Sequence, residues 1–157
     1  MTSFQKIWDV AEDNHGVITT AQAQKLGVNA PALVSMAQNH KLIRIGHGVY
    51  KLEMHSPGQY DEYAEAVALV GETGFIRGAS SLVMRGLLPF DPSCMYLGVS
   101  RRMRRRLPSG YNVRYVKSPN IEYIEGIPVE RIASAIADAR AYGAADEDAL
   151  LAVESMR

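Results

Sequence analysis

The residues best suited to chemistry are arginines and side-chain amides, and they lie in two separate stretches. One stretch is the run Arg-Arg-Met-Arg-Arg-Arg from Arg101 to Arg106, whose like charges repel unless an anion or an acidic surface lies near. The other contains Asn29, Gln38 and Asn39, whose amides are able to pair with the edge of adenine through two hydrogen bonds. Contact with phosphates and reading of bases are therefore the chemistries to test first.

Enzymatic chemistry finds little support in the sequence. The four histidines form no metal-ligand pair at helical spacing, and the single cysteine, Cys94, has no histidine close to it in sequence. Gly71, Gly74 and Gly78 are too loosely spaced for a phosphate-binding loop. We therefore expect a protein without enzymatic activity, without a cofactor and without a metal.

A helix-turn-helix is predicted around the amides. Thr19 or Thr20 is able to cap a helix over residues 21–26, and Gly27 ends this helix because glycine adopts positive φ without steric cost. Val28 then fills the corner before the second helix. Asn29 caps that helix, and Pro31 stands in its first turn, where no N–H partner is lost.

The second helix is followed by two strand-like runs, residues 41–45 and 49–52, joined by Gly46-His47-Gly48 as a hairpin. Leu33, Met36 and Ala37 recur at helical spacing and should face the core. The predicted outward side of the helix carries small or amide side chains: Asn29, Ala30, Ala32, Ser35, Gln38 and Asn39. A helix-turn-helix followed by a hairpin is the layout of a winged helix, which commonly places one helix in a DNA groove.

The predicted DNA contacts come from this helix, the hairpin and the arginine run. They are Thr20, Asn29, Ala30, Ser35, Gln38, Asn39, Arg44, His47, Lys51, Arg101, Arg102, Arg104, Arg105 and Arg106. Two alternatives stay open. A winged helix can serve only in packing or protein binding, and the second helix has no Arg or Lys before Lys41. The arginine run, predicted to form an exposed hairpin or loop, can instead meet an acidic protein surface or simply be solvated.

These residues also carry a resemblance to a known family. The stretch from Gly16 to Leu52, with Thr-Thr-Ala-Gln-Ala at Thr19–Ala23, Leu-Gly-Val at Leu26–Val28 and the hairpin motifs Leu-Ile-Arg-Ile and Gly-Val-Tyr, resembles the N-terminal domain of AbiEi-family antitoxins. The resemblance is strongest over residues 4–52. It implies a bacterial antitoxin of a type IV toxin–antitoxin system that represses its own operon and counters a nucleotidyltransferase-type toxin.

Composition is ordinary for a globular protein, and the overall charge does not by itself indicate a nucleic-acid partner. The 157 residues are 47% hydrophobic, and 17 basic residues balance 17 acidic ones. The middle of the chain is nevertheless basic and its end acidic. The first residues lack the apolar core of a signal peptide, and no apolar run reaches membrane-spanning length, so we expect a soluble cytoplasmic protein.

The rest of the chain predicts a second domain. A linker containing Pro57 and Gly58 separates residues 1–54, the winged helix, from residues 60–157. Helices are predicted from Asp61, from Ser80 or Ser81, over residues 131–142 and from Asp146. Strands are predicted over residues 95–99, 112–116 and 121–124. The fold class is therefore α+β, an N-terminal winged helix-turn-helix followed by a small mixed α+β domain.

The functional expectation is a repressor that binds double-stranded DNA at its own operator, as a homodimer or as cooperating copies. The resemblance adds the nucleotidyltransferase-type toxin as functional partner, whether or not the two proteins touch. Two rivals remain: a stand-alone winged-helix regulator whose C-terminal domain binds a ligand or forms a dimer, and a protein-interaction module without DNA binding.

Overall fold

The computed structural model describes residues 1–156, which form two compact units, Met1–Leu69 and the residues from Val70 onward. Both units combine helices with a β-sheet, which confirms the α+β class. The predicted boundary at residues 54–60 falls before this division, so the extent of each domain stays a prediction. The second domain is predicted to end at Arg157, which lies outside the described residues.

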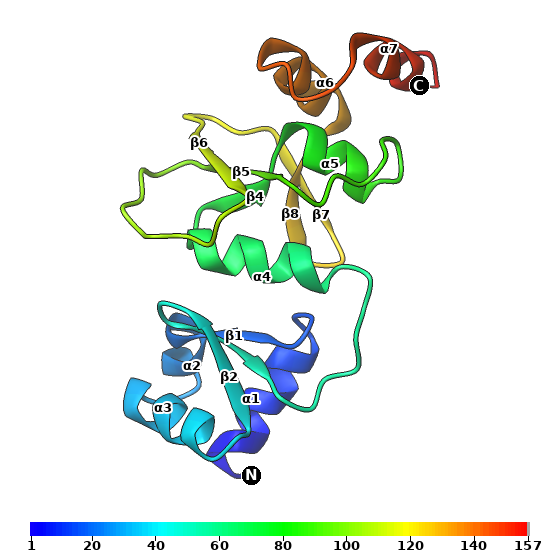
Figure 1. Cartoon of the computed structure of the whole chain (residues 1–157). Coiled ribbons are helices and arrows are strands. Elements are labelled where there is room, and N and C mark those ends of the chain that lie inside the picture. Colours follow the sequence, from blue (N-terminus) through cyan, green and yellow to red (C-terminus); the bar gives the residue numbers. More distant parts are fainter. Residues whose placement is uncertain (157) are drawn as a thin grey trace. The chain divides into compact units, whose positions relative to one another are not determined.

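Three helices and a three-stranded sheet make up most of the N-terminal unit (Figure 1). The elements are α1 (Ser3–Glu12), β1 (Val17–Thr19), α2 (Thr20–Lys25), α3 (Ala30–Gln38), β2 (Leu42–Gly46) and β3 (Val49–Leu52). The strands are antiparallel in the order β1-β3-β2. This is the winged helix-turn-helix expected from the sequence, with an additional strand, β1, before α2 that the sequence did not predict.

The extra strand and the helix caps explain how these elements begin. Thr19 ends β1 and its Oγ1 accepts a hydrogen bond from the Gln22 N–H at 3.1 Å, while the Gln22 side chain accepts from the Thr19 N–H at 2.9 Å. This capping box starts α2, so Thr19 rather than Thr20 is the cap. Thr2 caps α1 in the same way.

Apolar side chains from α1, α3 and the sheet form the core of the unit. Ile7, Ile18, Leu33 and Leu52 are almost completely buried, and Trp8 packs against them while partly exposed. The corner residue Val28 is buried as predicted, and Gly27 has the positive φ of +79° that ends α2. This core holds α3 in place from behind.

The linker leads into α4 (Asp61–Val70), which begins where the sequence predicted. Asp61 accepts a hydrogen bond from the Gly58 N–H at 2.9 Å before the helix. Ala64, Ala66 and Leu69 are buried. The division between the two units falls at the end of α4.

The second unit contains a five-stranded mixed sheet in the order β6-β5-β4-β8-β7. Its strands are β4 (Gly74–Ile76), β5 (Met95–Val99), β6 (Tyr111–Tyr115), β7 (Ile121–Ile124) and β8 (Ile127–Glu130). The sequence predicted three of them. It missed β4 and β8, whose short apolar segments have no alternation because nearly every residue in them is buried.

The arginine run lies between β5 and β6, which pair in parallel. A hairpin joins antiparallel strands, so the hairpin alternative was wrong, and the loop alternative is what the structure has. Residues 100–110 instead form a long connection without helix or strand, which carries the chain from the end of β5 back to the opposite end of the sheet, where β6 begins.

Three helices complete the unit: α5 (Gly78–Met84), α6 (Ile132–Ala141) and α7 (Glu147–Ser155). They pack through Leu82, Ile136 and Leu150. The predicted start of α5 at Ser80 or Ser81 was wrong, because both hydroxyls bond elsewhere. Ser80 Oγ accepts from the Tyr96 N–H at 2.7 Å, and Ser81 Oγ donates to the Glu130 carbonyl at 2.6 Å.

Candidate nucleic-acid interface

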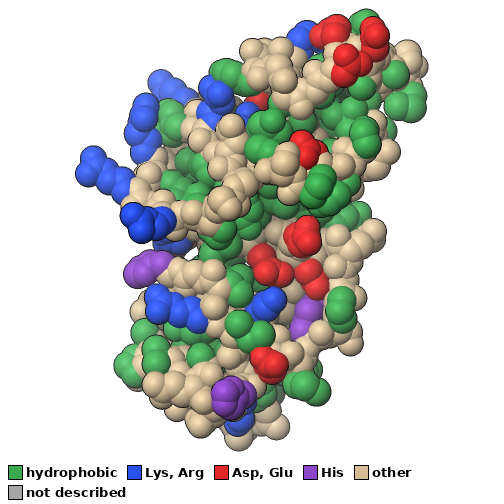
Figure 2. Space-filling view, in the orientation of Figure 1, with side chains coloured by type: hydrophobic (Ala, Val, Ile, Leu, Met, Phe, Trp, Pro, Cys, Tyr) green, Lys and Arg blue, Asp and Glu red, His purple; other side chains and the backbone are tan. Residues whose placement is uncertain are grey.

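Helix α3 presents one side to the core and the opposite side to solvent. Leu33 is buried, and Met36 and Ala37 pack on the same core, as the spacing predicted. Ala30, Ser35, Gln38 and Asn39 are exposed as expected. Figure 2 shows the surface over this helix mostly in tan and green.

Two residues of α3 differ from the prediction. Ala32, expected on the outward side, packs against the core cluster. Val34, which was not in the predicted set, is 47% exposed. Because residues four apart share a helix face, Ala30, Val34 and Gln38 form one outward stripe. An apolar residue is easily missed at such a position, since hydrophobic side chains are assigned to the core by default.

Asn29 and Thr20 are already engaged inside the unit. The Ala32 N–H donates to Asn29 Oδ1 at 3.0 Å, so the carbonyl oxygen of this amide caps α3. A bidentate contact to adenine needs both that oxygen and the amide NH2. Thr20 Oγ1 donates to the Gly48 carbonyl at 3.3 Å and thereby ties α2 to the hairpin. The first role of Asn29 is therefore to cap α3, and that of Thr20 is to hold the hairpin against α2.

The hairpin between β2 and β3 presents Arg44 and His47 to solvent. Arg44 Nε donates to the Gly46 carbonyl at 3.2 Å, which uses one of the five N–H groups of the guanidinium. Lys51 lies in the middle strand β3 and is half-buried. Its charge lowers the pKa of Glu65, although burial, the larger effect, leaves that pKa above its ordinary value. Lys51 is thus the least available of the three predicted wing contacts.

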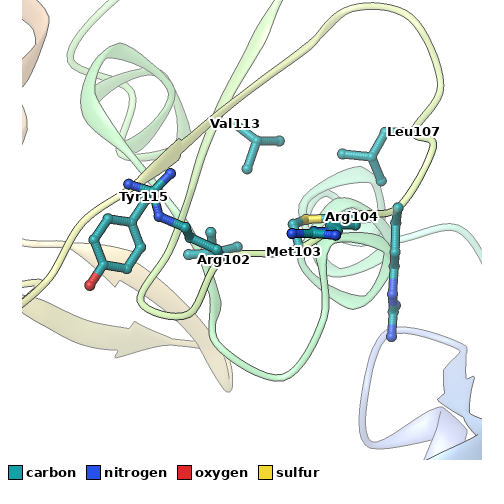
Figure 3. Close-up of a pocket in the computed structure, with 8 residues that line it drawn as sticks. Arg102, Met103, Arg104, Leu107, Val113 and Tyr115 are labelled. Carbon is teal, nitrogen blue, oxygen red and sulfur yellow. The ribbon is translucent and has the colours of Figure 1, made fainter.

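The arginine loop encloses a shallow pocket in the second unit. Its volume is about 450 Å³, and it is lined by Val99, Arg102, Met103, Arg104, Arg105, Leu107, Val113 and Tyr115. Figure 3 shows Val113 and Leu107 on one side of the pocket and Met103 and Arg104 on the other. The Arg102 guanidinium lies 4.9 Å from the centre of the Tyr115 ring. This cation–π contact holds one arginine of the loop in place.

All five predicted arginines of the loop are exposed. Figure 2 shows basic side chains gathered at this side of the second unit, and acidic side chains over its C-terminal helices. Two of those acids are already paired: Arg140 contacts Glu147 at 2.9 Å and also bonds Glu154. The loop is therefore a cationic surface suited to an anion, and the acidic end of the chain is partly neutralised by its own arginine.

A buried polar network holds the strands next to the loop. Arg77 is 1% exposed, and its Nη1 lies 2.6 Å from Asp138 Oδ1. Its Nε donates to the Leu97 carbonyl at 3.0 Å and its Nη2 to Asn112 Oδ1 at 2.9 Å. The sequence did not predict a role for Arg77, since nothing in one sequence distinguishes a buried arginine from an exposed one. The network fixes β5 and β6, which flank the loop.

Glu130 is the buried carboxyl group beside this network. Its Oε1 accepts a hydrogen bond from the Gly78 N–H at 2.8 Å. Burial raises the pKa of Glu130 above its ordinary value, and the Gly78 hydrogen bond opposes that rise. Asp138 raises the pKa further and Arg77 lowers it.

His55, in the linker, lies between two acidic side chains. Its Nδ1 lies 3.1 Å from Glu12 Oε1 and its Nε2 lies 3.2 Å from Asp61 Oδ2. Burial lowers the pKa of His55, but its hydrogen bonds and charge interactions with both carboxylates outweigh this, so the pKa stands above 6.5. This bridge connects the end of α1 to the start of α4.

Two other features to consider among the residues that the structure describes are a metal site and a membrane-spanning helix. Within residues 1–156, no group of three or more His, Cys, Asp or Glu side chains is arranged so that it could hold a metal ion. Within the same residues no helix is long and apolar enough to span a lipid bilayer.

The N-terminal unit thus has the order of helices and strands, the capped second helix and the cationic hairpin of a winged helix-turn-helix domain. Comparison with known families agrees: residues 5–52 match the family described as "Transcriptional regulator, AbiEi antitoxin". This match confirms the resemblance seen in the sequence. No curated protein matches the chain.

Proposed function

We propose that the chain is a DNA-binding repressor that acts as the antitoxin of a type IV toxin–antitoxin system. The observation that carries the proposal is the family match over residues 5–52, which covers the winged helix together with the exposed side of α3. The chain acts by binding, in the cytoplasm, and not by catalysis. It represses its own operon and counteracts a nucleotidyltransferase-type toxin.

In this proposal α3 enters the major groove and the hairpin contacts the backbone. Ser35, Gln38 and Asn39 face base edges, and Asn29 and Ala30 stand at the start of α3, the end that usually approaches the bases. Arg44 and His47 contact phosphates, Lys51 adds charge behind them, and Thr20 holds the hairpin against α2. Two copies bind a symmetric operator, since paired half-sites are the usual arrangement for this class.

The arginine loop adds phosphate contacts that carry no sequence information. Each phosphate neutralised contributes about 0.9 to the slope of log K against log salt concentration. Replacing Arg104, Arg105 and Arg106 together by alanine should therefore reduce that slope by up to about 3. The exposed Lys6 in α1 provides a control, and Lys6→Ala should leave the slope unchanged.

The test is a fluorescence-anisotropy titration of the full chain with its own upstream DNA and with random DNA, at several salt concentrations. We expect tighter binding to the upstream DNA. Equal affinity for the upstream DNA and for random DNA would refute the proposal that the chain is a sequence-specific repressor. An unchanged slope in the triple variant would refute only the role of the loop.

The antitoxin role is tested in cells. A nucleotidyltransferase-type gene beside this one, expressed alone, should stop growth, and expression of the full chain should restore it. Growth arrest that the chain does not relieve would refute the antitoxin role and leave the repressor intact.

One observation favours a second function, a stand-alone regulator whose C-terminal unit binds a ligand. The pocket under the arginine loop combines guanidinium groups with Tyr115 and an apolar wall of Val99 and Val113. Such a lining suits a small anion with an apolar part. A shift in the DNA affinity upon adding such ligands, in a genome without a neighbouring toxin gene, would support this alternative.

A further inference from the structure

The outward side of α3 has an unusual composition for a surface expected to meet DNA. The helix Ala30–Gln38 contains no charged residue, and its exposed stripe consists of Ala30, Val34 and Gln38. Val34 stands in the middle of the stripe and is 47% exposed. The stripe therefore offers methyl groups and one amide, and no guanidinium, ammonium or carboxylate group.

Positive charge stands beside this face rather than on it. Arg44 is exposed in the hairpin and Lys25 at the end of α2, whereas the ammonium group of Lys41, after α3, lies 5.0 Å from the centre of the Phe4 ring. Phosphates therefore have cationic partners at the edges. The centre of the face would then contact the bases, and a charged side chain suits only some of the bases.

The major groove of each base pair selects particular side chains. Guanine is read by Arg or Lys, and cytosine donates to Glu or Asp, whereas adenine pairs with Asn or Gln and the thymine methyl group packs on apolar atoms. The stripe has no Arg or Lys for guanine and no Glu or Asp for cytosine. It has Gln38 for adenine, and the methyl groups of Ala30 and Val34 for thymine.

We propose that α3 reads A·T base pairs, with Val34 packed on the C5-methyl group of a thymine and Gln38 bonded to an adenine. Ala30 lies one turn before Val34 and contacts a second thymine methyl group. This inference rests on the proposed DNA binding and adds the sequence class of the operator and a specificity-determining residue, Val34.

The expected size follows from the apolar contact. Burying one methyl group is worth about 0.8 kcal/mol, which is about fourfold in affinity at 25 °C. Uracil differs from thymine only in lacking that methyl group. Replacing a contacted thymine by uracil should therefore weaken binding about fourfold, as should loss of each Val34 methyl group that packs on it.

The experiment begins with selection of preferred sites from random DNA by the full chain, followed by titration of the selected site with thymine or uracil at each position. We expect A·T pairs in each half-site and about a fourfold loss at one or two thymines. Val34→Ala should weaken binding to thymine DNA and make the uracil substitution at one of these positions nearly neutral. Leu151→Ala, an exposed apolar residue of α7, is the control and should change neither affinity.

Each other outcome counts against a defined statement. No selected site at all would overturn the proposed DNA binding, and this inference with it. A selected site with G·C pairs at the centre of each half-site would overturn the inference alone. So would Val34→Ala weakening thymine and uracil DNA equally, because the valine would then not touch the methyl group. Circular dichroism of the variant confirms that the fold is retained.

Discussion

The buried ion pair between Arg77 and Asp138 allows a quantitative prediction for the second unit. Their side chains are 1% and 11% exposed, and the two charged atoms lie 2.6 Å apart. Asp138→Asn keeps the size of the side chain and removes the charge, so the Arg77 guanidinium stays buried without its ion-pair partner. Removing one partner of a buried pair typically costs about 3–5 kcal/mol.

We expect the lower end of this range, about 3 kcal/mol, because Arg77 keeps its hydrogen bonds to the Leu97 carbonyl and to Asn112. With an m value of about 2 kcal/mol/M, the urea midpoint should fall by about 1.5 M. Glu72→Gln removes an exposed carboxylate from the same unit and should shift stability by less than about 0.5 kcal/mol.

Two optical probes separate the units in this assay. Trp8 is the only tryptophan and lies in the N-terminal unit, so its fluorescence reports that unit. Far-UV circular dichroism follows both units. The variant should therefore lower the circular dichroism midpoint. A loss of less than about 1 kcal/mol for Asp138→Asn would refute the reasoning, since the buried guanidinium would then be solvated without its partner.

Two further predictions concern His55 and Gly98. The pKa of His55 is above its unfolded value of 6.5, so its pairing with Glu12 and Asp61 stabilises the fold fully at pH below 6.5 and is lost as pH rises through the folded value. The urea midpoint of wild type should therefore exceed that of His55→Asn most at about pH 5, and this difference should shrink as the pH rises to about 9. A difference that does not change with pH would contradict the pairing. A Cβ at Gly98 would overlap the Phe75 ring across the β4–β5 pair, so Gly98→Ala should cost about 1–3 kcal/mol by thermal unfolding, and Phe75→Leu in the same chain should recover part of it. Equal melting temperatures of Gly98→Ala and wild type would show that the sheet has room for the methyl group.

The local structure of the winged helix could be predicted from neighbouring residues alone. The caps at Thr19 and Asn29, the turn at Gly27 and the apolar spacing of Leu33, Met36 and Ala37 act between residues close in the chain, so they are readable from one sequence. The same holds for α4 and for the Asp146 cap of α7. The family match over residues 5–52 covers the caps at Thr19 and Asn29 and the turn at Gly27.

Strand pairing and side-chain burial depend on residues far apart in the chain, so they became visible only in the folded structure. β8 is a strand because it pairs with β4 and β7, and the arginine run is a crossover because β5 and β6 are parallel. The exposure of Val34 and the burial of Arg77 likewise follow from which neighbours cover them. Local sequence fixes where the chain turns, whereas burial is set by contacts between segments far apart in sequence, and these decide which side chains remain available for DNA.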